Sequence, residues 1–85
     1  MISTKVTVTT TATLIVPAGD KYRTVYVHNG GGSTIYVGGA SVTTATGFHL
    51  GNNESQDFVV PTNEKLYAVV NSSTNDIIVL TPDLD

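Results

Sequence analysis

The chain has no cysteine and no tryptophan, and charged residues make up only 13% of its 85 residues. Without cysteine, neither a disulfide framework nor a thiolate zinc site can hold the fold, so stability depends on a hydrophobic core. No apolar run exceeds a few residues, which excludes a membrane-spanning helix. The basic residues are too few for the cluster that follows a phosphate backbone. We therefore expect neither nucleic acid nor a membrane as a partner. The four basic residues are Lys5, Lys21, Arg23 and Lys65.

Residues able to support catalysis are also scarce. His28 and His49 stand alone, without the histidine or cysteine spacing of a metal site, and the carboxylates are scattered over turns. The glycine run Gly30–Gly32 lacks the Lys-Ser/Thr pair of a phosphate-binding loop. We expect no enzyme, no catalytic residue, no metal and no cofactor. An enzyme would need a deep pocket that joins a histidine to a carboxylate, and the open alternative for the histidines is a pH-sensitive interface contact.

What the chain does contain is β-forming residues, with twelve valines and fourteen threonines. Turn signals recur about every eight to twelve residues, which is typical of a sandwich or barrel. The sequence predicts an all-β fold, a small antiparallel β-sandwich or jelly-roll-like barrel of about eight short strands. We expect one domain over residues 1–85, with a short N-terminal arm (residues 1–4), no secretory signal and an acidic C-terminal tail (residues 82–85).

The clearest local signal lies at the centre of the chain. The apolar segments 25–27 and 35–39 flank the glycine run, and they predict a β-hairpin with a loose tip. In this hairpin Val25, Val27, Ile35 and Val37 would face the core. Residues 38 and 39, both glycines, would form a bulge or sharp turn with positive φ.

Several large side chains fall on the opposite face from the core in this alternating pattern. Tyr26 and Tyr36 oppose the hairpin valines, and Tyr67 opposes its own aliphatic neighbours. Ile78 and Leu80 belong to a last strand that is apolar on both faces, which indicates a central strand or an edge covered by a neighbour. Because the core is small, we expect an oligomer. These five residues are its candidate interface, with ordinary cross-strand pairing as the alternative.

The order of these segments resembles a known family. It resembles small β-sandwich virion proteins of tailed bacteriophages over residues 4–81, although Asn53 replaces an expected glycine. The resemblance implies a head decoration (cement) protein on the outer surface of the capsid, made in the host cytoplasm. Its implied partners are the major capsid protein and further copies of itself in a homotrimer. The segments that carry the resemblance are Thr24–Asn29, Ile35–Gly39, Val42–Leu50, Glu54–Ser55 and Lys65–Val69.

A second reading of the same resemblance is a tail, neck or fibre module that binds a receptor or glycan. Glycan sites combine exposed aromatic rings with amide or carboxylate groups. Tyr22, Tyr26, Tyr36 and Asn29 are the candidates for such a site.

Overall fold

The computed structural model describes residues 1–82, which form eight strands and no helix, so none that could cross a membrane. The all-β prediction and the expected number of strands are confirmed. Residues 83–85 of the predicted acidic tail lie outside the described residues. The strands are β1 (Ile2–Val8), β2 (Thr13–Val16), β3 (Arg23–Asn29), β4 (Ile35–Gly38), β5 (Phe48–Leu50), β6 (Ser55–Val60), β7 (Leu66–Val70) and β8 (Asn75–Thr81).

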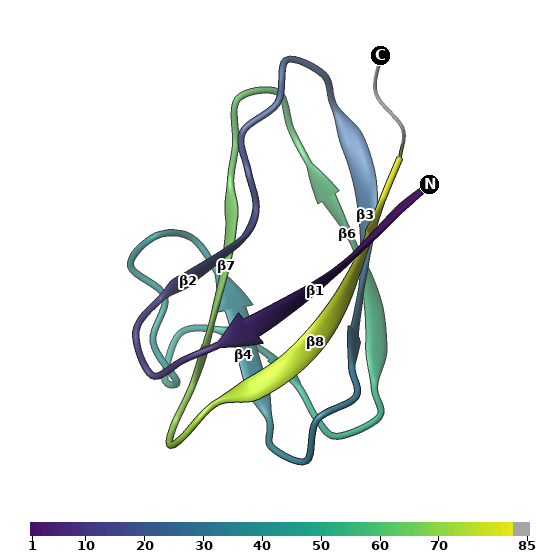
Figure 1. Cartoon of the computed structure of the whole chain (residues 1–85). Coiled ribbons are helices and arrows are strands. Elements are labelled where there is room, and N and C mark those ends of the chain that lie inside the picture. Colours follow the sequence, from purple (N-terminus) through teal and green to yellow (C-terminus); the bar gives the residue numbers. More distant parts are fainter. Residues whose placement is uncertain (83–85) are drawn as a thin grey trace.

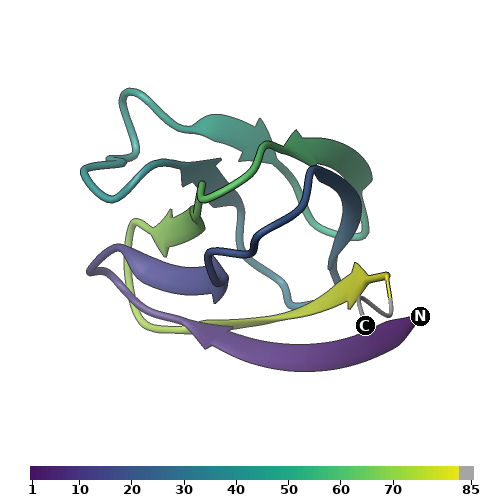
Figure 2. The ribbon, with the colours of Figure 1, turned by 90° about the horizontal axis from the view of Figure 1, so that it is seen from above.

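The strands form two packed four-stranded antiparallel sheets (Figures 1 and 2). Sheet A has the order β1-β8-β3-β6, and sheet B has the order β2-β7-β4-β5. Strands at equal distances from the middle of the chain pair with one another: β1 with β8, β2 with β7, β3 with β6 and β4 with β5. The chain is thus one long hairpin wound into two sheets, which is the topology of a jelly roll.

The core lies between the sheets and is built mainly of valine. β3 shows how the alternation works: Val25 and Val27 are fully buried, whereas Tyr26 and His28 face solvent. Phe48 and Phe58 close one side of the sandwich by an edge-to-face contact with ring centroids 5.4 Å apart. The buried cluster comprises Val8, Ile15, Val16, Val25, Val27, Ile35, Val37, Leu50, Val60, Ala68, Val70, Ile77 and Val79.

The predicted central hairpin is wrong. β3 pairs with β6 and β8 in sheet A, whereas β4 pairs with β5 and β7 in sheet B. The segment between β3 and β4 therefore crosses from one sheet to the other. The four expected inward residues, Val25, Val27, Ile35 and Val37, are buried as predicted, but they meet across the core and not along a shared ladder.

The crossing segment is held by two buried asparagines, so the expected loose glycine tip is also wrong. Asn75 Nδ2 donates to Asn29 Oδ1 at 2.6 Å, and Asn75 Oδ1 accepts from the backbone N–H groups of Gly32 and Ser33. Asn29 Nδ2 donates to the carbonyls of Ser33 and Leu50, which joins the end of sheet A to β5 of sheet B. Because each nitrogen and oxygen of the two side-chain amides has a hydrogen-bond partner, their burial costs little and fixes the loop.

Two smaller expectations need correction. The predicted N-terminal arm at residues 1–4 is mostly strand, because β1 begins at Ile2 and pairs with β8 from Ile2↔Thr81 onward. The two glycines at 38 and 39 do not have positive φ. Gly38 is instead needed because a side chain at this position has no room: a Cβ there would lie 2.8 Å from Val42 Cγ2.

We expect Asn75→Ala to destabilise the protein by about 2 to 4 kcal/mol, because it removes one hydrogen bond to Asn29 Oδ1 and leaves the backbone N–H groups of Gly32 and Ser33 without their acceptor. Asn71→Ala is the matched control, since Asn71 is exposed in the loop that precedes the same strand. Urea unfolding of both variants measures the difference. Equal stabilities would contradict the role of the amide pair.

Gly31→Ala should destabilise by about 1 to 3 kcal/mol, because a Cβ at Gly31 collides with the side-chain amide of Asn75. The control is Gly32→Ala, since a Cβ at Gly32 meets nothing within 4 Å. That variant should remain within about 1 kcal/mol of the parent. Thermal unfolding measures both, and a Gly32→Ala loss as large as that of Gly31→Ala would show that backbone freedom, not space, is what the loop needs.

Candidate interaction surfaces

The five predicted interface residues lie on opposite outer faces of the sandwich. Tyr26, Ile78 and Leu80 belong to sheet A, and Tyr36 and Tyr67 belong to sheet B. The two faces are separated by the core, so these residues do not form one surface. The prediction placed Tyr26 and Tyr36 together because it assumed a hairpin between β3 and β4.

On sheet A, exposed apolar side chains lie on both sides of Tyr26, although its directly opposite neighbour on β6 is the carboxylate Asp57. Leu80 lies directly opposite Tyr26 on β8, and Ile78 lies diagonally from it on the same strand. Val59 lies diagonally from Tyr26 on the other neighbour, β6. Tyr26 is 48% exposed, Val59 54% and Ile78 38%. We call these four residues the Tyr26 patch. Val59 was missed, although the inward alternation of Phe58 and Val60 already placed it on the outer face.

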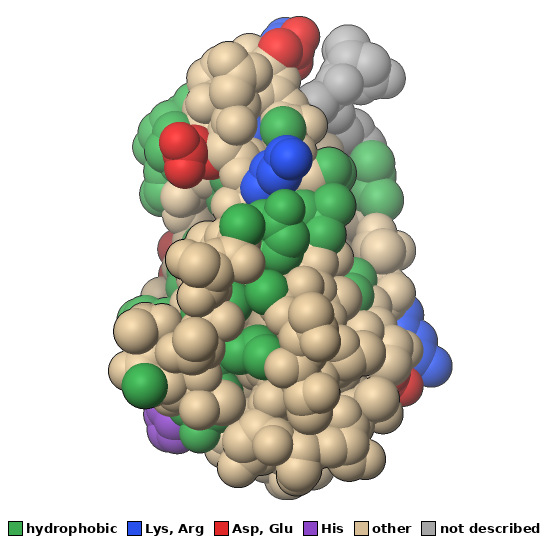
Figure 3. Space-filling model, turned by 90° about the vertical axis from the view of Figure 1, so that its left-hand side faces the viewer, with side chains coloured by type: hydrophobic (Ala, Val, Ile, Leu, Met, Phe, Trp, Pro, Cys, Tyr) green, Lys and Arg blue, Asp and Glu red, His purple; other side chains and the backbone are tan. Residues whose placement is uncertain are grey.

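The outer face of sheet B is partly covered by its own chain. Residues 39–47, between β4 and β5, fold back so that Val42 packs on Gly38 and is buried, and Gly47 packs on Tyr36. Tyr36 also contacts the His49 ring, with centroids 5.9 Å apart. Figure 3 looks onto the side of the molecule where β2 and β7 lie, and its hydrophobic side chains form separate groups, the upper ones next to a basic and an acidic side chain. Sheet A therefore presents the more open apolar surface.

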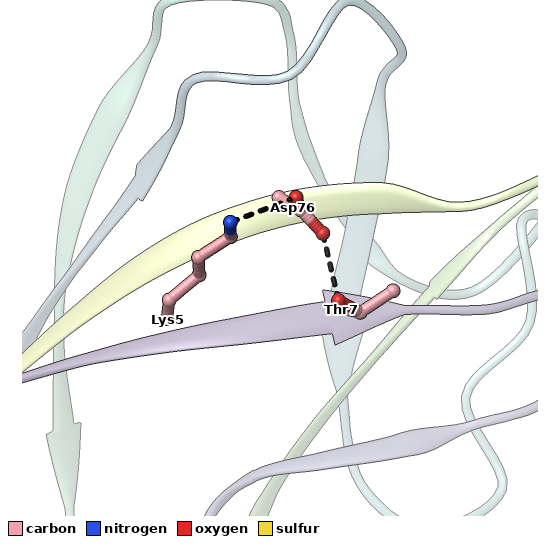
Figure 4. A network of polar contacts seen from close by, with 3 residues as sticks. All are labelled: Lys5, Thr7 and Asp76. Carbon is pink, nitrogen blue, oxygen red and sulfur yellow. Dashed lines mark hydrogen bonds and ion pairs between the residues drawn. The ribbon is translucent and has the colours of Figure 1, made fainter.

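The Tyr26 patch is bordered by a polar network on β1 and β8. Thr7 Oγ1 donates to Asp76 Oδ1 at 2.7 Å, and Lys5 Nζ lies 3.5 Å from Asp76 Oδ2 (Figure 4). The Thr7 hydrogen bond, supported by the Lys5 charge, holds the pKa of Asp76 below its usual value, against a smaller opposing effect of desolvation. The network is exposed, so its electrostatic contribution is screened by salt.

The residues considered for catalysis or ligand binding do not converge. His28 Nδ1 lies 2.6 Å from Ser55 Oγ on the outer face of sheet A, whereas His49 lies on sheet B. Within residues 1–82, no group of three histidine or acidic residues could hold a metal ion. The four glycan candidates are separated too, since Asn29 is fully buried in the amide network and Tyr26 and Tyr36 lie on opposite sheets.

One shallow groove of about 210 Å³ opens at the end of the sandwich where β3 begins. Arg23 is 95% buried there, and its guanidinium donates to the carbonyls of Pro17, Lys21, Pro61 and Glu64. Arg23 thereby holds the β2–β3 and β6–β7 connections together. Its role is structural, because these neutral acceptors occupy the donors of both terminal nitrogens. The groove is lined by Ile2, Val16, Pro17, Ala18, Gly19, Arg23, Thr81 and Pro82.

Comparisons with known proteins do not place the chain in a family. No protein-family model, no curated protein and no solved structure matches it. The surfaces described above are therefore the basis for any functional proposal.

Thr7→Val should raise the pKa of Asp76 toward its ordinary value of 3.8, because the largest stabilising contact of the carboxylate is removed. Lys5→Gln should shift it in the same direction by less. A carboxyl NMR titration measures both, with Ser3→Ala on the same face of β1 as the control. An unchanged Asp76 pKa in Thr7→Val would contradict the assignment.

The sign of the stability effect follows from the direction of the shift. Because the pKa of Asp76 is lower in the folded protein than its ordinary value of 3.8, the ionised carboxylate stabilises the fold fully above pH 3.8. This contribution to the free energy of unfolding is lost as the pH falls from 3.8 through the folded-state pKa. Thr7→Val should therefore make the protein less sensitive to acid in that window.

Proposed function

We propose that this protein is a structural component of a bacteriophage virion, a decoration protein that binds the outer surface of the head. The observation that carries the proposal is the Tyr26 patch: four apolar side chains gathered on an open sheet face and bordered by charged and polar groups. An apolar centre with a polar rim is the usual anatomy of a protein–protein interface. Tyrosine is among the residues enriched at such sites.

Two further points support this proposal. The order of the sequence segments resembles that of small virion β-sandwich proteins, and the jelly roll is a common fold of viral capsid domains. Because proteins with one fold can have many functions, the proposal depends mainly on the Tyr26 patch and less on the topology.

The mechanism would be passive. A sandwich whose Tyr26 patch docks across the junction of neighbouring capsomers would bury that patch on the assembled lattice and not on free capsid subunits. Anything that binds the assembled state preferentially stabilises it by mass action. The head would then resist the pressure of packaged DNA without any chemical step.

The alternative proposal, a receptor- or glycan-binding tail, neck or fibre module, has less support. Its aromatic and amide candidates are divided between two faces and the core. A rearrangement that exposed Asn29 would break the hydrogen bonds that hold the β3–β4 crossing.

The test is binding to purified heads assembled from the major capsid protein of the same virus. Wild-type protein should cosediment with heads and raise their disruption temperature. Tyr26→Ser should weaken binding by about tenfold or more, because it removes the largest side chain of the patch. Tyr36→Ser on the opposite face should bind as the parent does.

The outcomes separate the two proposals. Absence of binding to heads, together with adsorption to host cells or to a glycan array, would replace the decoration role with the tail or fibre role. Equal losses in the two tyrosine variants would show that the Tyr26 patch is not the docking surface.

A further inference from the structure

The two sheets have four edge strands, and three of them are protected against pairing with another chain. β2 is four residues long and carries a register shift between Leu14 and Val16, and β5 has three residues. On β6, Gln56 Nε2 donates to the carbonyl of Asp57, so a side chain occupies part of that edge. Short strands, bulges and blocked backbone groups are the common devices that prevent edge-to-edge association.

The fourth edge strand, β1, is not short, bulged or blocked in this way, and its one device against edge pairing is a single lysine. Its seven residues pair with β8 in an unbroken register, without a bulge or proline, and Lys5 is its one charged side chain. β1 lies at the border of the molecule in Figure 2, and sheet A has no strand beyond it among the described residues. About half of the backbone N–H and C=O groups of such a strand point away from its sheet.

We propose that β1 pairs with β1 of a second copy of this chain, antiparallel and around a two-fold axis, to make one eight-stranded sheet from two copies of sheet A. The proposal rests on the β1 edge alone and is independent of the proposed binding to heads. A two-fold arrangement uses the same surface on both copies and leaves no β1 edge open. It predicts a dimer, whereas the resemblance to decoration proteins implies a homotrimer.

The side chains of β1 favour a register centred on Val6. Centring the axis on Lys5 would place two ammonium groups directly opposite each other, which is unfavourable. Centring it on Val6 places Val6 opposite Val6 of the partner subunit and Lys5 opposite Thr7 of the partner subunit. The half-buried Val6 side chains then extend the apolar inner face across the axis.

Charge complementarity supports the same register. Thr7 is the residue that hydrogen-bonds Asp76, and Lys5 of the partner subunit would lie in the adjacent strand position. Strands in a sheet are about 4.8 Å apart, so the long lysine side chain can reach across Thr7 to Asp76. Each Asp76 would then be shared by the Lys5 side chains of both copies.

The first measurement is the native mass by light scattering over a range of concentrations. We expect twice the chain mass of 8.9 kDa. A monomer at about 100 μM, well above a micromolar dissociation constant, would overturn the proposal. A mass three times that of the chain would also overturn it, in favour of the trimer.

Cysteine substitution tests the register, because the native chain contains no thiol. Val6→Cys places two thiols opposite each other within the Cα separation of about 4.4 to 6.8 Å that a disulfide needs. Mild oxidation should give a disulfide-linked dimer on a non-reducing gel. In the same register, two Ser3→Cys positions lie about 20 Å apart and should not cross-link. Stronger cross-linking by Ser3→Cys, or by Lys5→Cys, than by Val6→Cys would overturn the register.

A charge exchange tests the shared Asp76. Lys5→Glu should weaken dimerisation by about tenfold, since two symmetry-related ion pairs are lost. The double variant Lys5→Glu/Asp76→Lys should restore it, because both attractions reappear with reversed sign. Native mass spectrometry of a mixture of wild type and double variant should show few mixed dimers. A statistical mixture would overturn the contact between the copies, because an ion pair confined to each chain does not influence the choice of partner.

Discussion

The buried amide network of Asn29 and Asn75, which are joined by one hydrogen bond, is the constraint on which the rest of the structure depends. Asn29 ends β3, Asn75 begins β8, and together they bind the loop that carries the chain from sheet A to sheet B. Arg23 has a similar role at the other end of β3, where its guanidinium donates hydrogen bonds to carbonyls of both the β2–β3 and the β6–β7 connection. The inward face of β3 is therefore polar at both ends and apolar in the middle, so one strand positions both ends of the sandwich.

The jelly-roll winding that follows from this crossing decides where the surface residues lie. It sends Tyr26 to one outer face and Tyr36 to the other. It also allows the segment between β4 and β5 to cover part of sheet B, while the outer face of sheet A stays open around Tyr26. The apolar patch and the β1 edge both belong to sheet A, so the two surfaces proposed for contacts lie on the same layer.

A surface with these properties is suited to assembly. The apolar face could dock on a larger lattice, and the β1 edge would join two copies through backbone hydrogen bonds. The two contacts use different parts of sheet A, since the patch centres on β3 and the edge is β1. Lys5 and Thr7 on β1 and Asp76 on β8 form a polar border next to both. The two proposed contacts would therefore be compatible with each other.

The amino-acid sequence by itself determined the fold class, the approximate strands and most inward positions, because alternation of valine with polar residues depends on neighbouring residues alone. Val25, Val27, Ile35 and Val37 were placed in the core correctly for that reason. Strand partners depend on contacts between residues far apart in the sequence, such as Asn29 with Asn75. The shortest connection suggested a hairpin, and only the tertiary structure showed that it crosses between sheets. The candidate surface was predicted residue by residue, with Val59 missed. Its division between two faces was decided by the same crossing, because the face on which a side chain lies is set by the sheet its strand joins.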